Sequence, residues 1–312
     1  MNYYMAPLEG ITGYLFRNAY ETCFGGINKY FTPFISPNQK RICRTRERND
    51  VLPEHNQGMI VVPQILTNQS ELFIKTVDYL EDLGYHEFNL NLGCPVGTVV
   101  SKKKGSGFLT EKEKLKNFLN KIYDSSDCKI SIKTRIGMKD ADEFDELLDI
   151  FNEFPVHELI IHPRTREDYY KNIPNLVAFE KGYNRCKTNV CYNGDIFLKE
   201  DYQHLISRFP ELGSMMFGRG ILRYPGLIRF IKDGTVMKKH ELLEFHNKIY
   251  ESYKHHLYGG KTVLFKMKEL WSYMIHSFQF DSGIEKRIKK AQKLLEYDDI
   301  IRELFSEYEL IL

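Results

Sequence analysis

A cysteine next to a lysine-rich loop is the first feature of the sequence that could carry out chemistry. Apolar and polar residues alternate across Phe88–Leu92, as in a half-buried strand, and Gly93 and Pro95 then flank Cys94. Three lysines follow at positions 102–104. A thiol at a strand end can act as an acid or a nucleophile, but most cysteines are small core residues. The spacing alone leaves both interpretations of Cys94 open.

Polar and charged residues also end the other expected strands. In a barrel of parallel strands the carboxyl ends meet at one mouth, so the residues to consider are set by position. They are Met5–Gly10, Gln64, Asn91, Lys133, Arg135, His162, Arg164, Asn193–Asp195 and Gly218–Gly220. The ammonium of Lys133 would need an anionic ligand or a carboxylate partner there, because desolvating it alone is costly. His162 could instead bond a neighbouring carbonyl, so its role stays open.

Two glycine-containing turns among these strand ends could surround an anion. Asn193–Asp195 and Gly218–Gly220 place backbone N–H groups after the seventh and eighth strands, where phosphate sites recur in barrels. Either turn alone could be a plain turn; together they favour a phosphate site. No metal site is expected, because His, Cys and carboxylates do not occur at ligand spacings. The set suits a polar, phosphorylated cofactor better.

Strands and helices must alternate to position these residues, and the sequence alternates in this way up to about residue 233. Eight strands are expected at 3–6, 29–34, 60–65, 87–92, 129–134, 158–162, 189–193 and 214–217. Helices are expected at 14–23, 69–83, 111–123, 142–154, 175–183, 199–208 and 225–232. This count and length predict a (β/α)₈ TIM barrel, an α/β fold. A doubly wound open sheet is the rival, and the polar strand ends favour the barrel.

The chain after Gly234 has a helical pattern only. Helices are expected at 239–257, 262–278, 284–297 and 298–310. Short connections between them predict a small helical bundle. We therefore expect a catalytic barrel domain at 1–236 and a separate helical domain at 237–312.

Composition narrows the class of protein. The chain has 312 residues, 42% of them hydrophobic and 28% charged, which is enough apolar material for a core. Six cysteines without a CxxC pair indicate a reducing compartment, and we expect a cytoplasmic protein. No apolar run is long enough for a membrane span, so no membrane association is expected. The net charge of +2 is too small to indicate nucleic acid by itself, so any basic surface must come from local clusters.

Seven stretches occur in the order found in one enzyme family. They are MAPLEGIT (5–12), VPQI (62–65), NLNLGCPVGTVVSKKKGSGFL (89–109), IKTRIG (132–137), IIHPRTRE (160–167), YNGDI (192–196) and FGRGILRYPGLI (217–228). Through them the chain resembles the tRNA-dihydrouridine synthase family, flavin-dependent enzymes that reduce uridines in RNA. The stretch around Cys94 is the most specific, whereas several of the others alone would fit many flavin barrels.

The resemblance implies a barrel that holds FMN and is reduced by NADPH or NADH. Near the flavin ring it implies Pro7, Leu8, Glu9, Gln64, Lys133 and His162, and at the phosphate end Asn193, Gly194, Asp195, Gly218 and Arg219. Asn91 would contact the target uracil. Cys94 would be the general acid that protonates C5 while C6 receives a hydride. The residues expected to bind the RNA are Lys102, Lys103, Lys104, Arg135 and Arg164.

The implied partner is tRNA, and a monomer without protein partners is expected. Two departures from the family pattern leave the substrate shape open: Pro163 replaces a common glycine, and Ile136–Met138 replaces a more usual Thr-Gly-Trp.

Two other functions remain as alternatives. One is an FMN barrel acting on a small molecule of the dihydroorotate or enoate type, and the other is a non-catalytic RNA-binding barrel. The helical tail argues against the first, and intact Cys94, Lys133 and Arg219 argue against the second.

Overall fold

The computed structural model describes residues 1–125, 127–280 and 282–311, and the chain divides into two compact units. The first, called the sheet unit, comprises Met1–Pro7, Asn28–Asp195 and Ile206–Phe217. The second, called the helical unit, comprises Leu8–Ile27, Ile196–Leu205 and Gly218–Leu312. The domain boundary expected between residues 236 and 237 stays a prediction.

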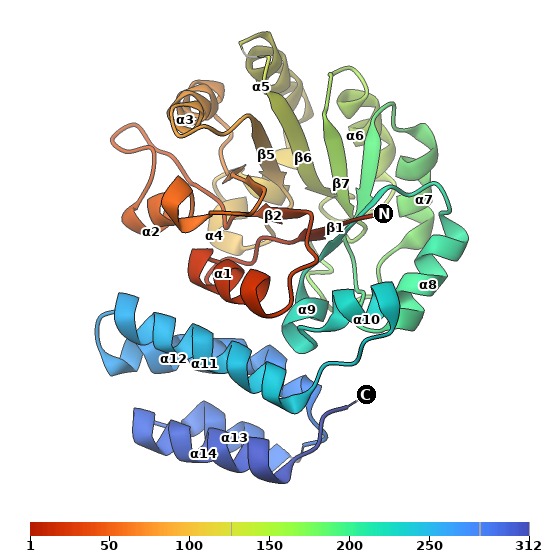
Figure 1. Ribbon diagram of the computed structural model, residues 1–312. Helices are drawn as coiled ribbons and strands as arrows, with labels where there is room; N and C mark the ends of the chain where they lie inside the picture. Colours follow the sequence, from red (N-terminus) through yellow and green to blue (C-terminus); the bar gives the residue numbers. More distant parts are fainter. Residues whose placement is uncertain (126, 281, 312) are drawn as a thin grey trace. The chain divides into compact units, whose positions relative to one another are not determined.

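Parallel strands form one nine-stranded sheet in the sheet unit, and Figure 1 labels several of them. They are β1 (Asn2–Met5), β2 (Lys29–Phe31), β3 (Val61–Val62), β4 (Gln64–Ile65), β5 (Glu87–Leu92), β6 (Lys129–Arg135), β7 (Glu158–His162), β8 (Asn189–Tyr192) and β9 (Ser214–Phe217). Their order is β3-β2-β1-β9-β8-β7-β6-β5-β4. The fold is a TIM-type barrel, as predicted, and the open doubly wound sheet is excluded.

The ring closes where Pro63 divides one expected strand into β3 and β4. These two strands stand at opposite ends of the sheet order although they are consecutive in the chain. Proline cannot donate a ladder hydrogen bond, which accounts for the division. Beyond β2, Ile35 pairs with Ile65 of β4, and its N–H donates to the Gln64 carbonyl at 2.8 Å. The closure therefore lies beside Gln64.

Strand β5 shows how the sequence separates the two faces of the ring. Phe88, Leu90 and Leu92 are fully buried on one face. Asn89 and Asn91 alternate with them and therefore point to the other face, toward the interior of the ring. The strand is thus buried on both sides, but only its inner face is polar.

Helices of the sheet unit follow the strands at nearly the expected places. They are α3 (Ser70–Glu81), α5 (Lys112–Asp124), α6 (Glu143–Phe151) and α7 (Leu176–Arg185), with α8 (Lys199–Arg208) extending from the helical unit. Short helices occupy the irregular connections: α2 (Thr45–Asn49), η1 (Pro53–His55), α4 (Gly97–Val100) and η2 (Gly105–Thr110). These were not predicted, because segments this short show no helical period. Gly182 of α7 permits close packing, since a Cβ there would lie 2.6 Å from Ile161 Cδ1.

The helical unit contains α1 (Tyr14–Cys23), α9 (Arg219–Arg223), α10 (Leu227–Asp233), α11 (Lys239–His256), α12 (Gly260–Met274), η3 (Ile275–Ser277), α13 (Ser282–Lys290) and α14 (Leu294–Glu307). In Figure 1, α11 lies beside α12 and α13 beside α14. The Phe245 ring of α11 meets Phe16 and Phe24 edge-on, at 5.5 Å and 5.3 Å. Through these contacts α1 packs with the bundle. No helix in the described ranges is both long and apolar enough to cross a membrane.

The predicted boundary between the last two helices, at residues 297/298, is wrong. Helix α13 ends at Lys290, and α14 begins at Leu294. Lys293 is extended, with φ −127° and ψ 149°, and the Gln292 N–H donates to the Glu296 carboxylate at 2.8 Å. Buried residues keep a helical spacing across this break, so periodicity alone could not locate it.

A hydrogen-bonded group of large side chains lies inside the bundle. Trp271 Nε1 and His246 Nε2 both contact the Tyr297 hydroxyl at 2.7 Å, and His246 Nδ1 lies 2.9 Å from the Asn247 side-chain oxygen. Because Trp271 can only donate, the hydroxyl can give its own proton to Nε2 of a neutral His246. Burial lowers the pKa of His246 from 6.5 to about 4.

We predict that the bundle loses stability in acid through His246. The folded-state pKa lies below the unfolded one, so unfolding takes up a proton between these values. Through His246, the free energy of unfolding should fall by about 2 kcal/mol as the pH is lowered from about 7.5 to about 5. Fluorescence of Trp271, the one tryptophan of the chain, reports urea unfolding of the bundle at each pH. His246→Gln should remove this part of the loss. Equal pH dependence in both proteins would contradict the assignment.

Candidate active site at the carboxyl ends of the strands

A chain of buried amides crosses three neighbouring strands beside the point where the ring closes. Asn91 Nδ2 donates to Gln64 Oε1 at 2.7 Å, and Gln64 Nε2 donates to Asn89 Oδ1 at 2.7 Å. Asn89 Nδ2 in turn donates to Ser131 Oγ at 2.9 Å, and Ser131 donates to the Phe88 carbonyl at 3.1 Å. Gln64, Asn89 and Ser131 are fully buried. Each member therefore fixes the orientation of the next.

Asn91, the first member of this row of amides, holds the turn that carries Cys94. Asn91 Oδ1 accepts the backbone N–H groups of Gly93 and Cys94, both at 3.0 Å. From the other side, Ser106 donates its hydroxyl to the Cys94 carbonyl at 2.9 Å. Gly105 has φ +56°, and a Cβ on it would lie 2.9 Å from Cys94 Cβ, so only glycine fits. Cys94 is a half-buried cysteine held in a defined backbone geometry.

The three lysines after this turn differ in their surroundings. Asn68 Nδ2 donates to the carbonyls of Lys102 and Lys103, at 3.1 Å and 3.0 Å, which fixes the loop. The Lys103 ammonium is paired with Glu111 at 3.1 Å. Burial lowers the pKa of half-buried Lys104, and the charge of Lys102 lowers it further. The exposed ammonium of Lys102 has no side-chain partner within the described ranges.

Lys133 is a buried cation on the inner face. It is the register partner of Asn91, on the adjacent strand. Burial and the charge of nearby Arg135 lower its pKa to about 8, against smaller opposing effects of Cys191 and Cys94. Neither a hydrogen bond nor an ion pair joins its ammonium to any residue in the described part of the chain. The salt-bridge alternative considered from the sequence is therefore wrong, and a cationic group is left for an anionic or acceptor ligand.

Arg135 binds the protein's own backbone. Its Nε donates to the Gly93 carbonyl at 3.0 Å, and its Nη1 donates to the carbonyls of Thr165 and Tyr169 at 2.8 Å and 2.9 Å. Its guanidinium also lies 5.3 Å from the Tyr170 ring centre. The buried arginine thus ties the Cys94 turn to the loop after β7. Its predicted contact with RNA stays a prediction.

Arg164 links His162 to Asp195. It forms two bonds to the Asp195 carboxylate, at 3.2 Å and 2.5 Å, and its Nη1 lies 3.1 Å from His162 Nε2. A guanidinium only donates, so Nε2 accepts, and a neutral His162 ring carries its proton on Nδ1. Arg164 is 2% exposed, so most of its surface is covered by the protein. Its predicted RNA contact also stays a prediction.

The remaining predicted residues are divided between the two units. In the sheet unit, Pro7 follows β1, and Asn193 Nδ2 donates to the Met216 carbonyl at 2.8 Å. A Cβ on Gly194 would lie 2.2 Å from the Tyr192 hydroxyl, so this position requires glycine.

The predicted residues of the helical unit lie on two short segments. Leu8 N–H donates to Thr12 Oγ1 at 2.8 Å, and Glu9 follows in the same turn. Lys266 of α12 donates to the Gly10 carbonyl at 2.6 Å. Gly218 precedes α9, and the Arg219 guanidinium lies 5.5 Å from the Phe197 ring centre.

Several residues of the site were missed in the sequence. Asn89 and Ser131 were detectable, because both alternate with apolar residues in expected strands. Tyr169, Tyr170 and Arg166 lie on an irregular loop, and no periodic signal marks them. Arg166 lies 4.8 Å from the Tyr169 ring centre and donates to the Pro95 carbonyl at 3.2 Å. Among the described residues, no group of three or more His, Cys, Asp and Glu is placed to hold a metal.

Comparison with known proteins gives consistent results. Residues 4–305 match the family model described as dihydrouridine synthase. A probable tRNA-dihydrouridine synthase of Staphylococcus epidermidis is 27% identical over 98% of this chain and 93% of that protein. The tRNA-dihydrouridine synthase B of Pasteurella multocida is 26% identical over 77% of this chain and 71% of its own length. Among solved structures, morphinone reductase in complex with tetrahydroNAD has a TM-score of 0.52 at 11% identity, covering 78% of this chain and 90% of that one. This last similarity shows the fold alone.

We predict that Asn91→Ala loosens the Cys94 turn, whereas Asn91→Asp does not. Alanine leaves the half-buried Gly93 and Cys94 N–H groups without their acceptor, at a combined cost of roughly 1–3 kcal/mol. Hydrogen exchange of the peptide that contains both amides should then become about tenfold faster or more. Aspartate keeps an acceptor oxygen and should retain the protection. Unchanged exchange in Asn91→Ala would show that the turn does not depend on this side chain.

Proposed function

The chain belongs to the dihydrouridine synthase family, and on this basis we propose that it reduces specific uridines of tRNA to 5,6-dihydrouridine. FMN would be the bound cofactor, and NADPH or NADH the reductant. The protein is thus an oxidoreductase. The observation that carries the proposal is the Cys94 turn, held by Asn91, with the Lys133 ammonium, unpaired among the described residues, on the adjacent strand. Together they provide a possible proton donor and an uncompensated positive charge.

The groups at the strand ends fit a flavin. Among the described residues the Lys133 ammonium has no partner, a neutral His162 carries its proton on Nδ1, and Gln64 uses only one of its two amide N–H bonds in the amide chain. We propose that these three residues hold the ring, together with Pro7, Leu8 and Glu9. Asn193, Gly194, Asp195, Gly218 and Arg219 would hold the phosphate end. When bound, FMN supplies the hydride for C6 of the uracil.

Cys94 would give the proton that completes the reduction. Saturating the C5–C6 bond requires a hydride at C6 and a proton at C5, and a neutral thiol at Cys94 can donate the second. The thiolate left behind would regain a proton from water. Asn91 supports this role by fixing the backbone at Cys94, and its second amide N–H is available to a uracil carbonyl. The positive charge of Lys133 would favour an anionic ring.

Recognition of the RNA requires cations that are available to phosphates. Lys102 and Lys104 meet this condition, whereas Lys103 is paired with Glu111. Arg135 and Arg164 are occupied by backbone and carboxylate groups, so we propose that they shape the site more than they bind RNA. We further propose that residues 237–312 form an RNA-binding domain. The target uridine must leave its stack to reach a half-buried thiol. We expect a cytoplasmic monomer that acts on tRNA.

We predict that Cys94→Ala keeps the cofactor and loses turnover. The variant removes only the proton donor, so its yellow FMN spectrum should match that of the wild type. The rate of dihydrouridine formation in an unmodified tRNA transcript should fall by roughly 10²-fold or more, as measured by mass spectrometry of nucleosides. Cys43→Ala serves as a control, because Cys43 lies outside the strand ends. Wild-type turnover in Cys94→Ala would refute the general-acid role.

Lys102 and Lys103 form a matched pair for testing RNA contact. Lys102→Ala should weaken tRNA binding and reduce the slope of log affinity against log salt by about 1, the value for one lost phosphate contact. Lys103→Ala should change the slope much less, since that ammonium is paired with Glu111. Filter binding at several salt concentrations measures both. Identical slopes in all three proteins would exclude this loop from the RNA interface.

A further inference from the structure

The sheet unit contains a polar pocket at the amino ends of the strands. It has a volume of about 560 Å³ and is lined by residues that include Tyr4, Lys29, Glu158, Asn189 and Ser214. Glu158 is the first residue of β7, and His162 is the last. At about 3.3 Å per residue these two lie roughly 13 Å apart along the strand. The pocket is therefore separate from the residues proposed to bind the flavin and uracil.

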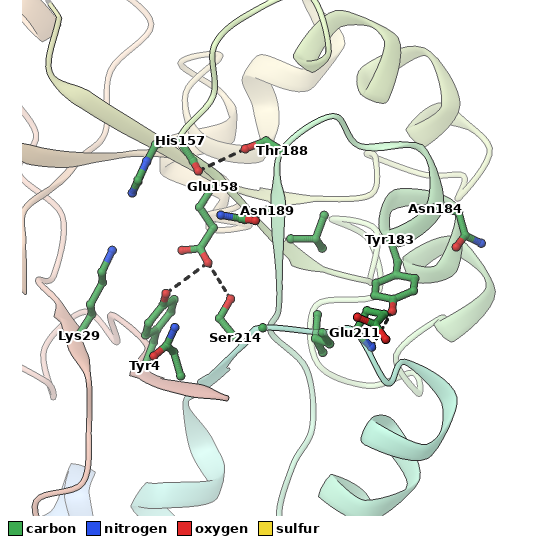
Figure 2. A pocket seen from close by; sticks show the side chains of 14 residues that line it. Tyr4, Lys29, His157, Glu158, Tyr183, Asn184, Thr188, Asn189, Glu211 and Ser214 are labelled. Atoms are coloured by element: carbon green, nitrogen blue, oxygen red, sulfur yellow. Dashed lines mark hydrogen bonds between the residues drawn. The ribbon is translucent and has the colours of Figure 1, made fainter.

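Glu158 is the unusual residue of this pocket. It is 5% exposed, and its Oε1 accepts hydrogen bonds from Ser214 Oγ at 2.6 Å and from the Tyr4 hydroxyl at 3.3 Å. Its Oε2 is buried and has no hydrogen-bond partner in the described chain. Figure 2 shows the carboxyl group projecting from β7 toward the side of the pocket that carries Lys29, Tyr4 and Ser214. A buried acceptor oxygen without a donor is costly, so this atom favours a ligand that donates.

The surrounding charges favour a cation. Lys29 lies nearby, but its ammonium is bonded to both oxygens of Glu87 at 2.7 Å, so that charge is already balanced. Burial lowers the pKa of His157, and Lys29 and Lys129 lower it further while Glu87 raises it, so the ring is neutral near pH 7. Glu211 adds a second carboxylate to the lining. Burial raises the pKa of Glu158, and a cation placed beside Oε2 would stabilise its ionised form.

An organic cation fits better than a metal ion. Within the described ranges, no cluster of three or more His, Cys, Asp and Glu could hold a metal. Val190 and Leu212, both nearly buried, supply apolar surface in the same pocket that could cover a short methylene chain. We propose that this pocket binds a small alkylammonium ion, whose N–H group donates to Glu158 Oε2. This site is independent of the proposed reduction of uridine.

Titration calorimetry with putrescine tests the proposal on the full-length protein. Glu158→Gln keeps an acceptor for Ser214 and Tyr4 but removes the charge, so affinity should fall about tenfold or more. Glu54→Gln, an exposed carboxylate outside the pocket, should bind like the wild type. The bis-quaternary analogue of putrescine, tetramethylene-bis(trimethylammonium), carries the same two charges without an N–H donor and should bind much more weakly than putrescine.

A second variant keeps the test valid if Glu158→Gln does not fold. Asn189 is the register partner of Glu158 on β8, is exposed, and has no side-chain hydrogen bond within the described chain. Asn189→Lys would place an internal ammonium beside the carboxylate and should abolish putrescine binding. Circular dichroism confirms the fold of each variant. Absence of putrescine binding by the wild type, or undiminished binding by folded Glu158→Gln or Asn189→Lys, would overturn the proposal.

Discussion

The buried amide chain from Asn91 through Gln64 and Asn89 to Ser131 is the constraint on which the site depends. It joins β4, β5 and β6 on the inner face, directly beside the Pro63 break where the ring closes. Polar side chains in this position stabilise the barrel only if each of them is hydrogen-bonded. Loss of one partner would leave its neighbours without a hydrogen bond in an interior that excludes water. Asn91 joins this network through its amide nitrogen, so its oxygen Oδ1 can accept the two N–H groups of the Cys94 turn. Closure of the barrel and placement of the thiol are thus a single structural feature.

Most charged side chains on the inner face have a hydrogen-bond or ion-pair partner. One group at each end of the barrel is the exception. At the carboxyl ends, Arg135 is bound to backbone carbonyls and Arg164 to Asp195, so Lys133 remains unpaired among the described residues. At the amino ends, Lys29 is bound to Glu87, and Glu158 keeps one oxygen without a donor. Unpaired buried charges have a free-energy cost, and proteins retain them mainly where a ligand compensates the charge. These two exceptions are the observations behind the two proposed binding sites, one for an anionic or acceptor ligand and one for a cation.

Much of the fold could be predicted because alternation and turn residues mark strands directly. All eight expected strands are present, and the segment 60–65 differs only in its division at Pro63. The boundary between α13 and α14 could not be found, because buried residues continue at helical spacing across an extended Lys293. The extended backbone at Lys293 separates the two helices, and the pattern of buried side chains does not mark this position.

The positions of the candidate site residues were predictable to a similar degree. Cys94, Asn91 and Lys133 lie at strand ends, where position alone selects them. A sequence shows the charge of an arginine but not its partner, so Arg135 and Arg164 were expected to face RNA, although the structure shows them bound within the protein. The ring of Tyr170, on an irregular loop, could not have been placed beside Arg135 by any periodic signal.

The most direct test of the account is the product that the purified protein forms in RNA. The protein, with FMN and NADPH, is mixed with an unmodified tRNA transcript, and the nucleosides are then analysed by mass spectrometry. The account predicts dihydrouridine at defined positions, with one NADPH consumed for each uridine reduced. Oxidation of NADPH by a small enone, with no dihydrouridine in the transcript, would contradict it.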